Sequence, residues 1–222
     1  KDQLPSVGAG NVLKDIISSS LIPCITLSKI FRQAMMSNII VNAHRINSGL
    51  MPLENQSEND FFIMSRDNAQ DIQNLIVDLI TKRLPEHYNI KQSDVQIITP
   101  MKKREIGTQN LNKVLQNALN PKSPTKNEFE TNFRIYREGD RVIHVKNDYE
   151  KLWKDDAGIE GSGIFNGDTG VIQMVSPSDK ILTVLFDDGK KAIYDFDELG
   201  ELEHAFALTV HKSQGSEYPC II

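Results

Sequence analysis

The chain has 222 residues, and hydrophobic residues make up 39% of it, which is enough for a folded core and excludes wholesale disorder. Its formal net charge of −5 excludes nucleic-acid binding through a global positive charge, so any such site must be local. Neither a signal peptide nor an apolar run of membrane length is present, and Cys24 and Cys220 stand in apolar runs, so we expect buried, reduced thiols in a cytoplasmic protein.

The first segment is a glycine-containing loop followed by an apolar pattern of helical spacing. Residues 3–10 include Pro5 and two glycines, and the apolar residues that follow recur at the intervals of a helix. They are Val12, Leu13, Ile16 and Ile17. A glycine-containing loop before a helix can face a phosphate. Spacing alone nevertheless favours an ordinary junction between a loop and a helix.

A short apolar strand is predicted at residues 25–27, and a second helix is predicted through residues 36–43, ending near Gly49 and Pro52. Arg32 stands between them, where its planar guanidinium suits a phosphate. The alternative is a surface salt bridge, which the residue pattern alone favours.

The next elements carry no predicted chemistry. Residues 61–64 predict a short strand, and residues 68–84 predict an amphipathic helix that Pro85 ends. We interpret this helix as structural.

A buried strand is predicted at residues 95–100, and a run of three basic residues follows at 102–104. Open α/β sheets bind ligands beyond the carboxyl ends of their strands. Lys102 therefore lies either at a phosphate or in a solvated loop, and both interpretations stay open. A further helix is predicted between Gly107 and Pro121.

This alternation of strands and helices predicts an α/β domain with a mostly parallel sheet. From Arg134 to about Gly200 the pattern changes to short β-type runs separated by turns, at residues 141–145, 170–175, 181–186 and 192–194. We therefore expect a small antiparallel β-barrel inserted into the α/β domain. Between Asn147 and Phe165, around Trp153, we expect a long mobile loop.

The predicted insert carries the excess negative charge of the chain. Residues 134–200 hold nine Lys and Arg against fourteen Asp and Glu, while the remainder is neutral. Bulk electrostatics therefore do not attract nucleic acid to the insert.

The most polar turn of the chain surrounds Gly215. The α/β pattern resumes at residues 204–208, an apolar run at 205–210 leads into the turn, and a second apolar run at 218–222 follows it. Glycine permits a backbone conformation that other residues resist, and exposed amides there can face an anion. We find no His and Cys cluster with metal-ligand spacing and expect no metal ligands.

Three stretches in this order resemble the third, fourth and fifth motifs of superfamily-one helicases: residues 3–13, 31–34 and 209–217. The resemblance is to the RecD-like branch, the family of the exodeoxyribonuclease V alpha subunit. Residues 99–103, 111–112, 139–142 and 165–170 also resemble that branch, the last two at the start of an inserted Src-homology-3-like barrel. The resemblance to this branch implies a RecA-like motor domain.

The resemblance implies a catalytic role for Gln3 as a sensor of the γ-phosphate and for Arg32 as an arginine finger. Gly215 and Glu217 would border the ribose and phosphates of the nucleotide. The cofactors implied are ATP and Mg²⁺.

The resemblance also implies contacts with the backbone of single-stranded DNA. Thr209, His211 and Lys212 would face that backbone, with Thr99 and Lys102 as further contacts. Such contacts do not depend on base sequence. The family moves 5′ to 3′ and acts in recombination or repair, which makes other nuclease or helicase subunits candidate partners.

The chain lacks the phosphate-binding loop of such motors, since no Gly-x-x-x-x-Gly-Lys-Ser/Thr pattern occurs in it. We therefore expect a fragment that does not hydrolyse ATP alone. Residues 1–133 and 201–222 would form the second motor domain, and residues 134–200 the inserted barrel.

Two alternatives stay open. The chain could come from the helicase region of a conjugative relaxase, or it could be a non-catalytic module that binds DNA or protein. The acidic insert gives the second alternative some support.

Overall fold

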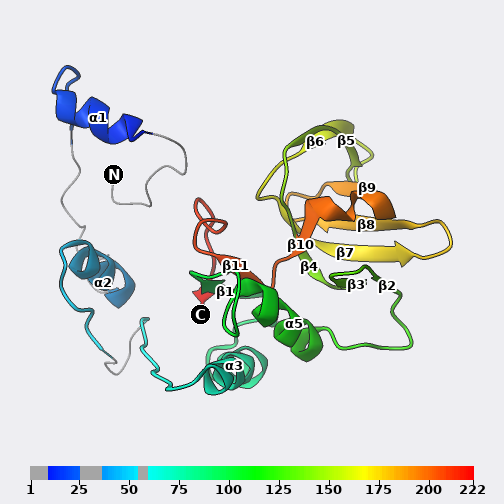
Figure 1. Ribbon diagram of the computed structural model, residues 1–222, viewed down its shortest axis with the longest axis horizontal. Helices are drawn as coiled ribbons and strands as arrows, with labels where there is room; N and C mark the ends of the chain where they lie inside the picture. Colours follow the sequence, from blue (N-terminus) through cyan, green and yellow to red (C-terminus); the bar gives the residue numbers. More distant parts are fainter. Residues whose placement is uncertain (1–9, 26–36, 55–59) are drawn as a thin grey trace. The chain divides into compact units, whose positions relative to one another are not determined.

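The computed structural model describes residues 10–25, 37–54 and 60–222, which fall into two compact units divided after Ser65 (Figure 1). Within these residues no helix has the length and apolar character needed to cross a membrane. Cys24 is exposed and Cys220 is half-buried, and both are free thiols. The expectation that both are buried is therefore wrong for Cys24.

The first unit contains two of the predicted helices. Helix α1 spans Val12–Ser19 and buries none of its residues, and helix α2 spans Asn38–Asn47. The predicted strand at 61–64 is wrong, because these residues belong to none of the strands in the described part of the chain. The predicted strand at 25–27 falls largely outside the described residues.

The second unit contains a parallel sheet with strand β1, Val95–Thr99, at its centre. Strand β11, Ala207–Thr209, and strand β12, Cys220–Ile221, pair in parallel with its two edges. The predicted α/β class and the buried strand are confirmed. The chain between β11 and β12 must therefore run from the carboxyl end of the sheet back to its amino end.

Helices cover this sheet through an apolar cluster. Helix α5, Thr108–Leu119, confirms the predicted helix, and helix α3 spans Ala69–Asp78. The buried members of the cluster are Ile76, Ile80, Val95, Ile97, Leu111, Leu115 and Ala207. Burial of this apolar surface stabilises the unit.

Pro85 does not end the helix, contrary to prediction. A π-helical turn, η2 at Leu79–Arg83, follows α3, and helix α4, Leu84–Tyr88, contains Pro85 in its first turn. The π-helical turn directly before Pro85, in which the Leu84 amide donates to the Leu79 carbonyl oxygen five residues back, interrupts the regular α-helical ladder that a proline would otherwise break. The chain then passes through a 3₁₀ turn, η3 at Gln92–Asp94, into β1.

The other half of the second unit is antiparallel. A hairpin of β2, Glu128–Glu130, and β3, Ile135–Arg137, precedes a seven-stranded sheet of order β10-β4-β7-β8-β9-β5-β6. The seven strands are β4, Arg141–His144; β5, Asp148–Lys154; β6, Glu160–Ile164; β7, Thr169–Ser176; β8, Ile181–Phe186; β9, Lys191–Asp195; and β10, Leu202–His204. A 3₁₀ helix, η4 at Phe196–Glu201, connects β9 to β10.

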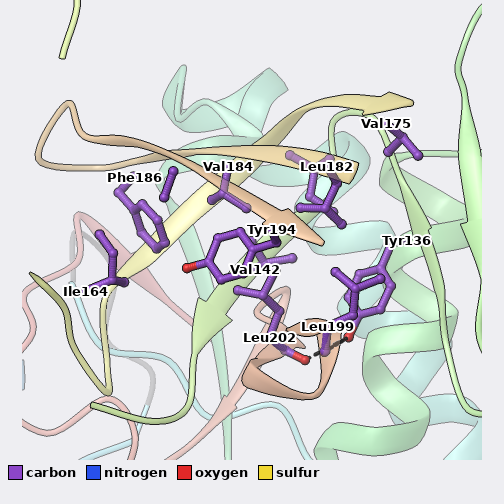
Figure 2. Close-up of a cluster of buried hydrophobic side chains, with 12 residues drawn as sticks. Tyr136, Val142, Ile164, Val175, Leu182, Val184, Phe186, Tyr194, Leu199 and Leu202 are labelled. Atoms are coloured by element: carbon purple, nitrogen blue, oxygen red, sulfur yellow. Dashed lines mark hydrogen bonds between the residues drawn. The ribbon is translucent and has the colours of Figure 1, made fainter. Parts of the chain in front are cut away.

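The four predicted β-runs of this region are confirmed, but the barrel is not closed. Strands β10 and β6 end the strand order and do not pair with each other in the described chain. The core inside the curved sheet is nonetheless continuous, and includes the fully buried rings of Tyr136 and Tyr194 (Figure 2). Tyr136 attaches the β2–β3 hairpin to η4 and β10, because its hydroxyl donates to the carbonyl oxygens of Leu199 and Leu202 at 3.0 and 2.7 Å.

The mobile loop predicted between Asn147 and Phe165 is instead the hairpin of β5 and β6. Most of its charged residues are exposed or half-buried and hide the strand pattern, although Lys151 is buried. Trp153 packs against the core, and a Cβ atom on Gly161 would lie 2.4 Å from the Trp153 ring. The glycine therefore leaves the space in which the indole lies across its neighbouring strand.

Candidate nucleic-acid groove

A groove of about 600 Å³ opens beside the carboxyl end of the parallel sheet. One wall is α5, the floor includes the end of β11, and the opposite wall is the turn between β2 and β3. Lys102, Thr209 and Lys212 all line it. The fold thus brings Lys102 to the same surface as Thr209 and Lys212, which follow it by more than a hundred positions in the sequence.

The two predicted threonines are neighbours in the sheet, since Thr99 pairs with Thr209. The hydroxyl of Thr99 donates to the carbonyl oxygen of Ile106 at 2.9 Å, and Thr99 does not line the groove. The Thr209 hydroxyl accepts a 3.3 Å hydrogen bond from the Lys212 amide. Thr99 therefore shapes the loop that carries Lys102, while Thr209 shapes the turn that carries Lys212.

Lys212 is the half-buried cation of the groove. Its Nζ donates to Oδ1 of Asn166 at 3.1 Å. Burial lowers the pKa of Lys212, the carboxylate of Glu203 raises it, and the positive charge of Lys102 lowers it further. Two ammonium groups that repel each other in a partly dehydrated groove form a favourable place for an anion.

The groove is locally basic, although the chain as a whole is acidic. Its lining contains four basic residues and two acidic ones. They are Lys102, Lys113, Arg134, Lys212, Glu130 and Glu203. Two of these six charges pair with each other, because Arg134 Nη2 lies 3.1 Å from Glu203 Oε1. The excess of positive charge matches the phosphate backbone of a nucleic acid.

The turn after β11 is compact and hydrogen-bonded. Both Lys212 and Ser213 donate their amides to the carbonyl oxygen of Thr209, at 2.9 and 3.1 Å. Gly215 has a φ of +87°, and nothing lies within 4 Å of a Cβ atom built on it. The left-handed backbone, rather than crowding, therefore requires glycine here. His211 is exposed on this turn and does not line the groove.

Glu217 lies at the other end of the sheet. It lines a second cavity of about 270 Å³ with Asp94, which directly precedes β1. Arg141 also lines this cavity, but its guanidinium binds the Asp187 carboxylate through bonds of 3.0 and 2.7 Å. The predicted DNA and nucleotide contacts of the turn thus separate to opposite ends of β1.

ATP fits the predicted nucleotide residues only in part. Gly215 offers an open backbone and Glu217 an exposed carboxylate that suits a ribose hydroxyl. Arg141, the cation lining the second cavity, is already paired with Asp187. The described residues near Glu217 therefore suit a ribose but supply no free cation for a triphosphate. Gln3 and Arg32 lie outside the described residues.

A polar stripe along α5 was missed by the sequence interpretation. Asn112, Gln116 and Asn120, spaced four residues apart, are all buried. Asn112 accepts from the Ala207 amide at 2.8 Å and donates to the carbonyl oxygens of His204 and Ala207. The four-residue spacing was a readable signal, but polar residues on a helix are more often taken for its solvated face.

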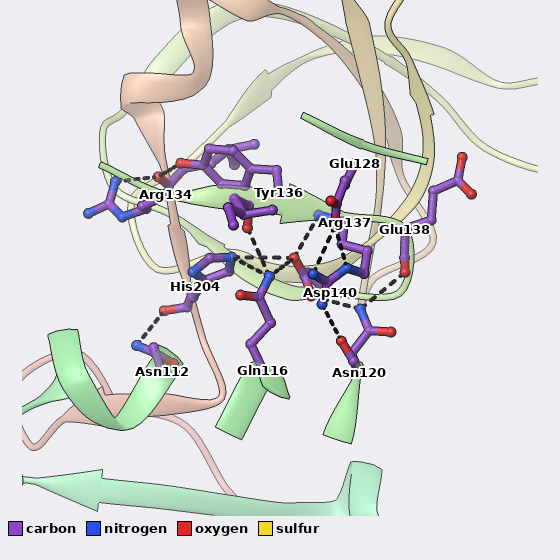
Figure 3. Close-up of polar contacts among 12 residues, drawn as sticks. Asn112, Gln116, Asn120, Glu128, Arg134, Tyr136, Arg137, Glu138, Asp140 and His204 are labelled. Carbon is purple, nitrogen blue, oxygen red and sulfur yellow. Dashed lines mark hydrogen bonds and ion pairs between the residues drawn. The ribbon is translucent and has the colours of Figure 1, made fainter. Parts of the chain in front are cut away.

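The stripe ends at a fully buried carboxylate, Asp140 (Figure 3). Asp140 accepts from Gln116 Nε2 at 2.6 Å and Asn120 Nδ2 at 2.7 Å, and the Arg137 amide donates to it at 2.7 Å. His204 Nε2 lies 3.3 Å from the same carboxylate. Because α5 forms one wall of the groove and the antiparallel half carries the other, this network fixes the two walls together.

Comparisons with known proteins find chains that are similar to this one. Residues 111–186 match the model of a family described as the ATP-dependent RecD-like DNA helicase SH3 domain. The chain is 32% identical over its whole length to the ATP-dependent RecD2 DNA helicase of Deinococcus radiodurans. It is 24% identical over 74% of its length to the RecBCD enzyme subunit RecD of Buchnera aphidicola. It spans 27% of the length of each relative.

Solved structures of Pif1 helicases are similar at lower identity. One, from Bacteroides in complex with ADP-AlF3 and single-stranded DNA, is 18% identical, with 99% of this chain and 53% of that chain covered and a TM-score of 0.48. Another, from Candida albicans, is 16% identical, with coverages of 89% and 49% and a TM-score of 0.44.

Proposed function

The chain belongs to the RecD-like DNA helicases, and we propose that it supplies the second, RecA-like motor domain of an ATP-dependent helicase that moves along single-stranded DNA. The observation that carries this proposal is the basic groove in which Lys102, Thr209 and Lys212 converge. The direction proposed is 5′ to 3′, in recombination or repair. The domain division proposed is 1–133 with 201–222 for the motor and 134–200 for the insert.

In this function Lys102 and Lys212 bind successive phosphates of the strand. Their positive charges attract any DNA sequence equally, as a translocating motor requires. Thr209 orients the Lys212 backbone through its hydroxyl. His211, exposed one residue before Lys212, is placed to meet the strand outside the groove. The Asp140 network keeps the groove walls at a fixed separation while the strand moves.

ATP with Mg²⁺ supplies the energy for movement through phosphoryl transfer when bound to the complete motor. In this chain Glu217 would hold a ribose hydroxyl, and Gly215 would let the backbone approach the nucleotide. Gln3 and Arg32 keep their proposed roles as phosphate sensor and arginine finger. Because the sequence contains no phosphate-binding loop, the isolated chain should not hydrolyse ATP. The free thiols fit the cytoplasm, and other helicase or nuclease subunits are proposed partners.

The groove is tested by measuring the binding of this chain to fluorescein-labelled oligo(dT) by anisotropy at several salt concentrations. Lys102→Ala and Lys212→Ala should each weaken binding and reduce the salt dependence by about one phosphate contact. Lys154→Ala is the matched control, because Lys154 is exposed in the β5–β6 hairpin and pairs with Glu160. Equal binding by the two groove variants and the wild-type chain would reject the groove as the DNA site.

A further inference from the structure

Phe133 projects from the wall of the groove opposite α5. It lies in the turn between β2 and β3, lines the groove, and is 83% exposed, more than any other aromatic side chain of the described residues. A single exposed apolar side chain is ordinary on a protein surface. The ring is informative because the groove that it lines is also lined by Lys102 and Lys212.

The turn that carries Phe133 is held by an internal hydroxyl. The Thr131 Oγ1 donates to the Arg134 carbonyl oxygen at 2.9 Å and accepts from the amides of Phe133 and Arg134 at 3.3 and 3.0 Å. The Thr131 amide also donates to the Arg134 carbonyl oxygen at 2.8 Å. The backbone under the ring is therefore ordered before any ligand binds, which lowers the entropy lost on binding.

The same turn is attached to the strand that leads to the groove floor. Arg134 donates to the Leu202 carbonyl oxygen at 3.2 Å, and pairs with Glu203 at 3.1 Å. Both partners are in β10, four and five residues before Ala207, the first residue of β11, which ends at Thr209. The position of the Phe133 backbone is thus fixed relative to Thr209 and Lys212.

A flat apolar ring that shares a groove with a pair of ammonium groups matches the two halves of an unpaired nucleotide. The phosphate is an anion and the base has an exposed π-face, whereas in a duplex that face is covered by neighbouring bases. We propose that Phe133 stacks on a base of the single strand whose phosphates lie at Lys102 and Lys212. This inference rests on the proposed function of the groove and adds a contact to the base, which the backbone contacts do not supply.

The charge of the groove favours this occupant over a protein. A protein partner that covered Phe133 would have to present acidic groups to Lys102, Lys113 and Lys212 at the same time. Each nucleotide of a nucleic-acid strand supplies both a negative charge for the lysines and a base that can cover the Phe133 ring. Stacking is also tolerant of base sequence, because each base has a π-face.

The test compares oligo(dT) with an abasic deoxyribose-phosphate oligomer of equal length, using this chain and anisotropy. Phe133→Ala should weaken binding of oligo(dT) about tenfold, the scale of one stacked base, and leave binding of the abasic oligomer unchanged. Phe133→Trp should keep the affinity for oligo(dT). Its added indole fluorescence, measured against the wild-type signal of Trp153, should be quenched by oligo(dT) and not by the abasic oligomer.

Tyr149→Ala is the matched control, because Tyr149 is an aromatic residue 68% exposed on β5 and does not line the groove. It should bind both oligomers as the wild-type chain does. If Phe133→Ala binds oligo(dT) as tightly as the wild-type chain while Lys212→Ala does not, stacking is rejected and the groove stands. Equal weakening for both oligomers also rejects stacking, since the ring would then act only on the shape of the groove. If the wild-type chain binds neither oligomer, the groove and the stacking fail together.

Discussion

The Lys212 ammonium group has a pKa that burial in the groove lowers and that the positive charge of Lys102 lowers further, against the opposing effect of Glu203. The protein thus retains a cation in a place where its charge is unfavourable. This is the pattern expected of a residue kept for binding an anion rather than for folding. It leads to a prediction in which stability and DNA binding change in opposite directions.

Lys212→Met should raise the free energy of unfolding of the unliganded chain at neutral pH and weaken its binding to oligo(dT). The increase should be no more than about 1 kcal/mol, since water screens a half-buried group. Because the folded pKa lies below the ordinary value of 10.5, the penalty is full below the folded pKa, falls as the pH rises from there to 10.5, and disappears only above 10.5.

The gain should therefore be largest near pH 7 and clearly smaller near pH 10.5, as measured by urea unfolding at the two pH values. Lys154→Met is the control, because the Lys154 ammonium is exposed and pairs with Glu160 at 3.0 Å. Loss of stability in Lys212→Met at pH 7 would show that its ammonium group stabilises the fold, which contradicts the prediction.

Asp140→Ala should be strongly destabilising, by about 3–5 kcal/mol. It leaves the Gln116 and Asn120 amides and the Arg137 N–H group without their acceptor inside the protein, and unsatisfied buried donors cost about 1–3 kcal/mol each. Urea unfolding measures the change. Asp156→Ala removes an exposed carboxylate paired with Lys191 and should change stability by less than about 1 kcal/mol. Similar losses in the two variants would mean that the network adds nothing beyond an ordinary surface pair.

The sequence predicted those parts of the fold that local pattern controls. The apolar spacing of α5 follows from the burial of one face of the helix, and the continuous apolar run of β1 follows from the burial of both faces of the strand. The turn around Gly215 was also readable, because a left-handed residue favours glycine. The convergence of Lys102 with Thr209 and Lys212 was predicted only through the resemblance to a family.

What the sequence did not predict depends on contacts between distant residues. Asn112 and Gln116 look like solvated helix positions until the His204 carbonyl oxygen and the Asp140 carboxylate are placed beside them. The hairpin of β5 and β6 was taken for a loop, since its strand character depends on Trp153 packing over Gly161. The separation of Glu217 from Lys212 follows from the parallel pairing of β11 and β12, which no local pattern specifies.

His144 should make the chain less stable in mild acid. It is fully buried, and burial lowers its pKa below the ordinary 6.5, while Glu201, Asp148 and Asp168 raise it and Lys151 lowers it. Its Nδ1 atom faces the Tyr194 hydroxyl at 3.2 Å. Below pH 6.5 the unfolded chain takes up a proton that the folded chain resists. Stability should therefore fall as the pH drops from 6.5 towards the lowered pKa.

His144→Gln should show a smaller loss of stability than the wild-type chain between pH 7.5 and 5.5, whatever its stability at pH 7.5. The measurement is the urea midpoint at each pH, with His87→Gln as the control for an exposed histidine on α4. If the wild-type and His144→Gln chains lose equal stability over this range, His144 is not the source of the acid sensitivity.

Gly170 is enclosed by its neighbours in the sheet, and a methyl group there should be costly. It pairs with Val142 on one side and with Phe186 on the other. A Cβ atom would lie 2.5 Å from the Leu185 carbonyl oxygen and 2.8 Å from the Phe186 Cα atom. Both are backbone atoms, so no side-chain rotation relieves the clash and the strands themselves must separate.

We therefore expect Gly170→Ala to lower the free energy of unfolding by about 3 kcal/mol, near the upper end for overpacking. Gly200→Ala is the matched control, because nothing lies within 4 Å of a Cβ atom built there and its backbone is not left-handed. That variant should keep or slightly raise stability. Equal stability of the two variants in urea unfolding would mean that β7 and β8 can separate to admit the methyl group without a loss of folding free energy. The pairing of β7 with β8 would then not require glycine at position 170.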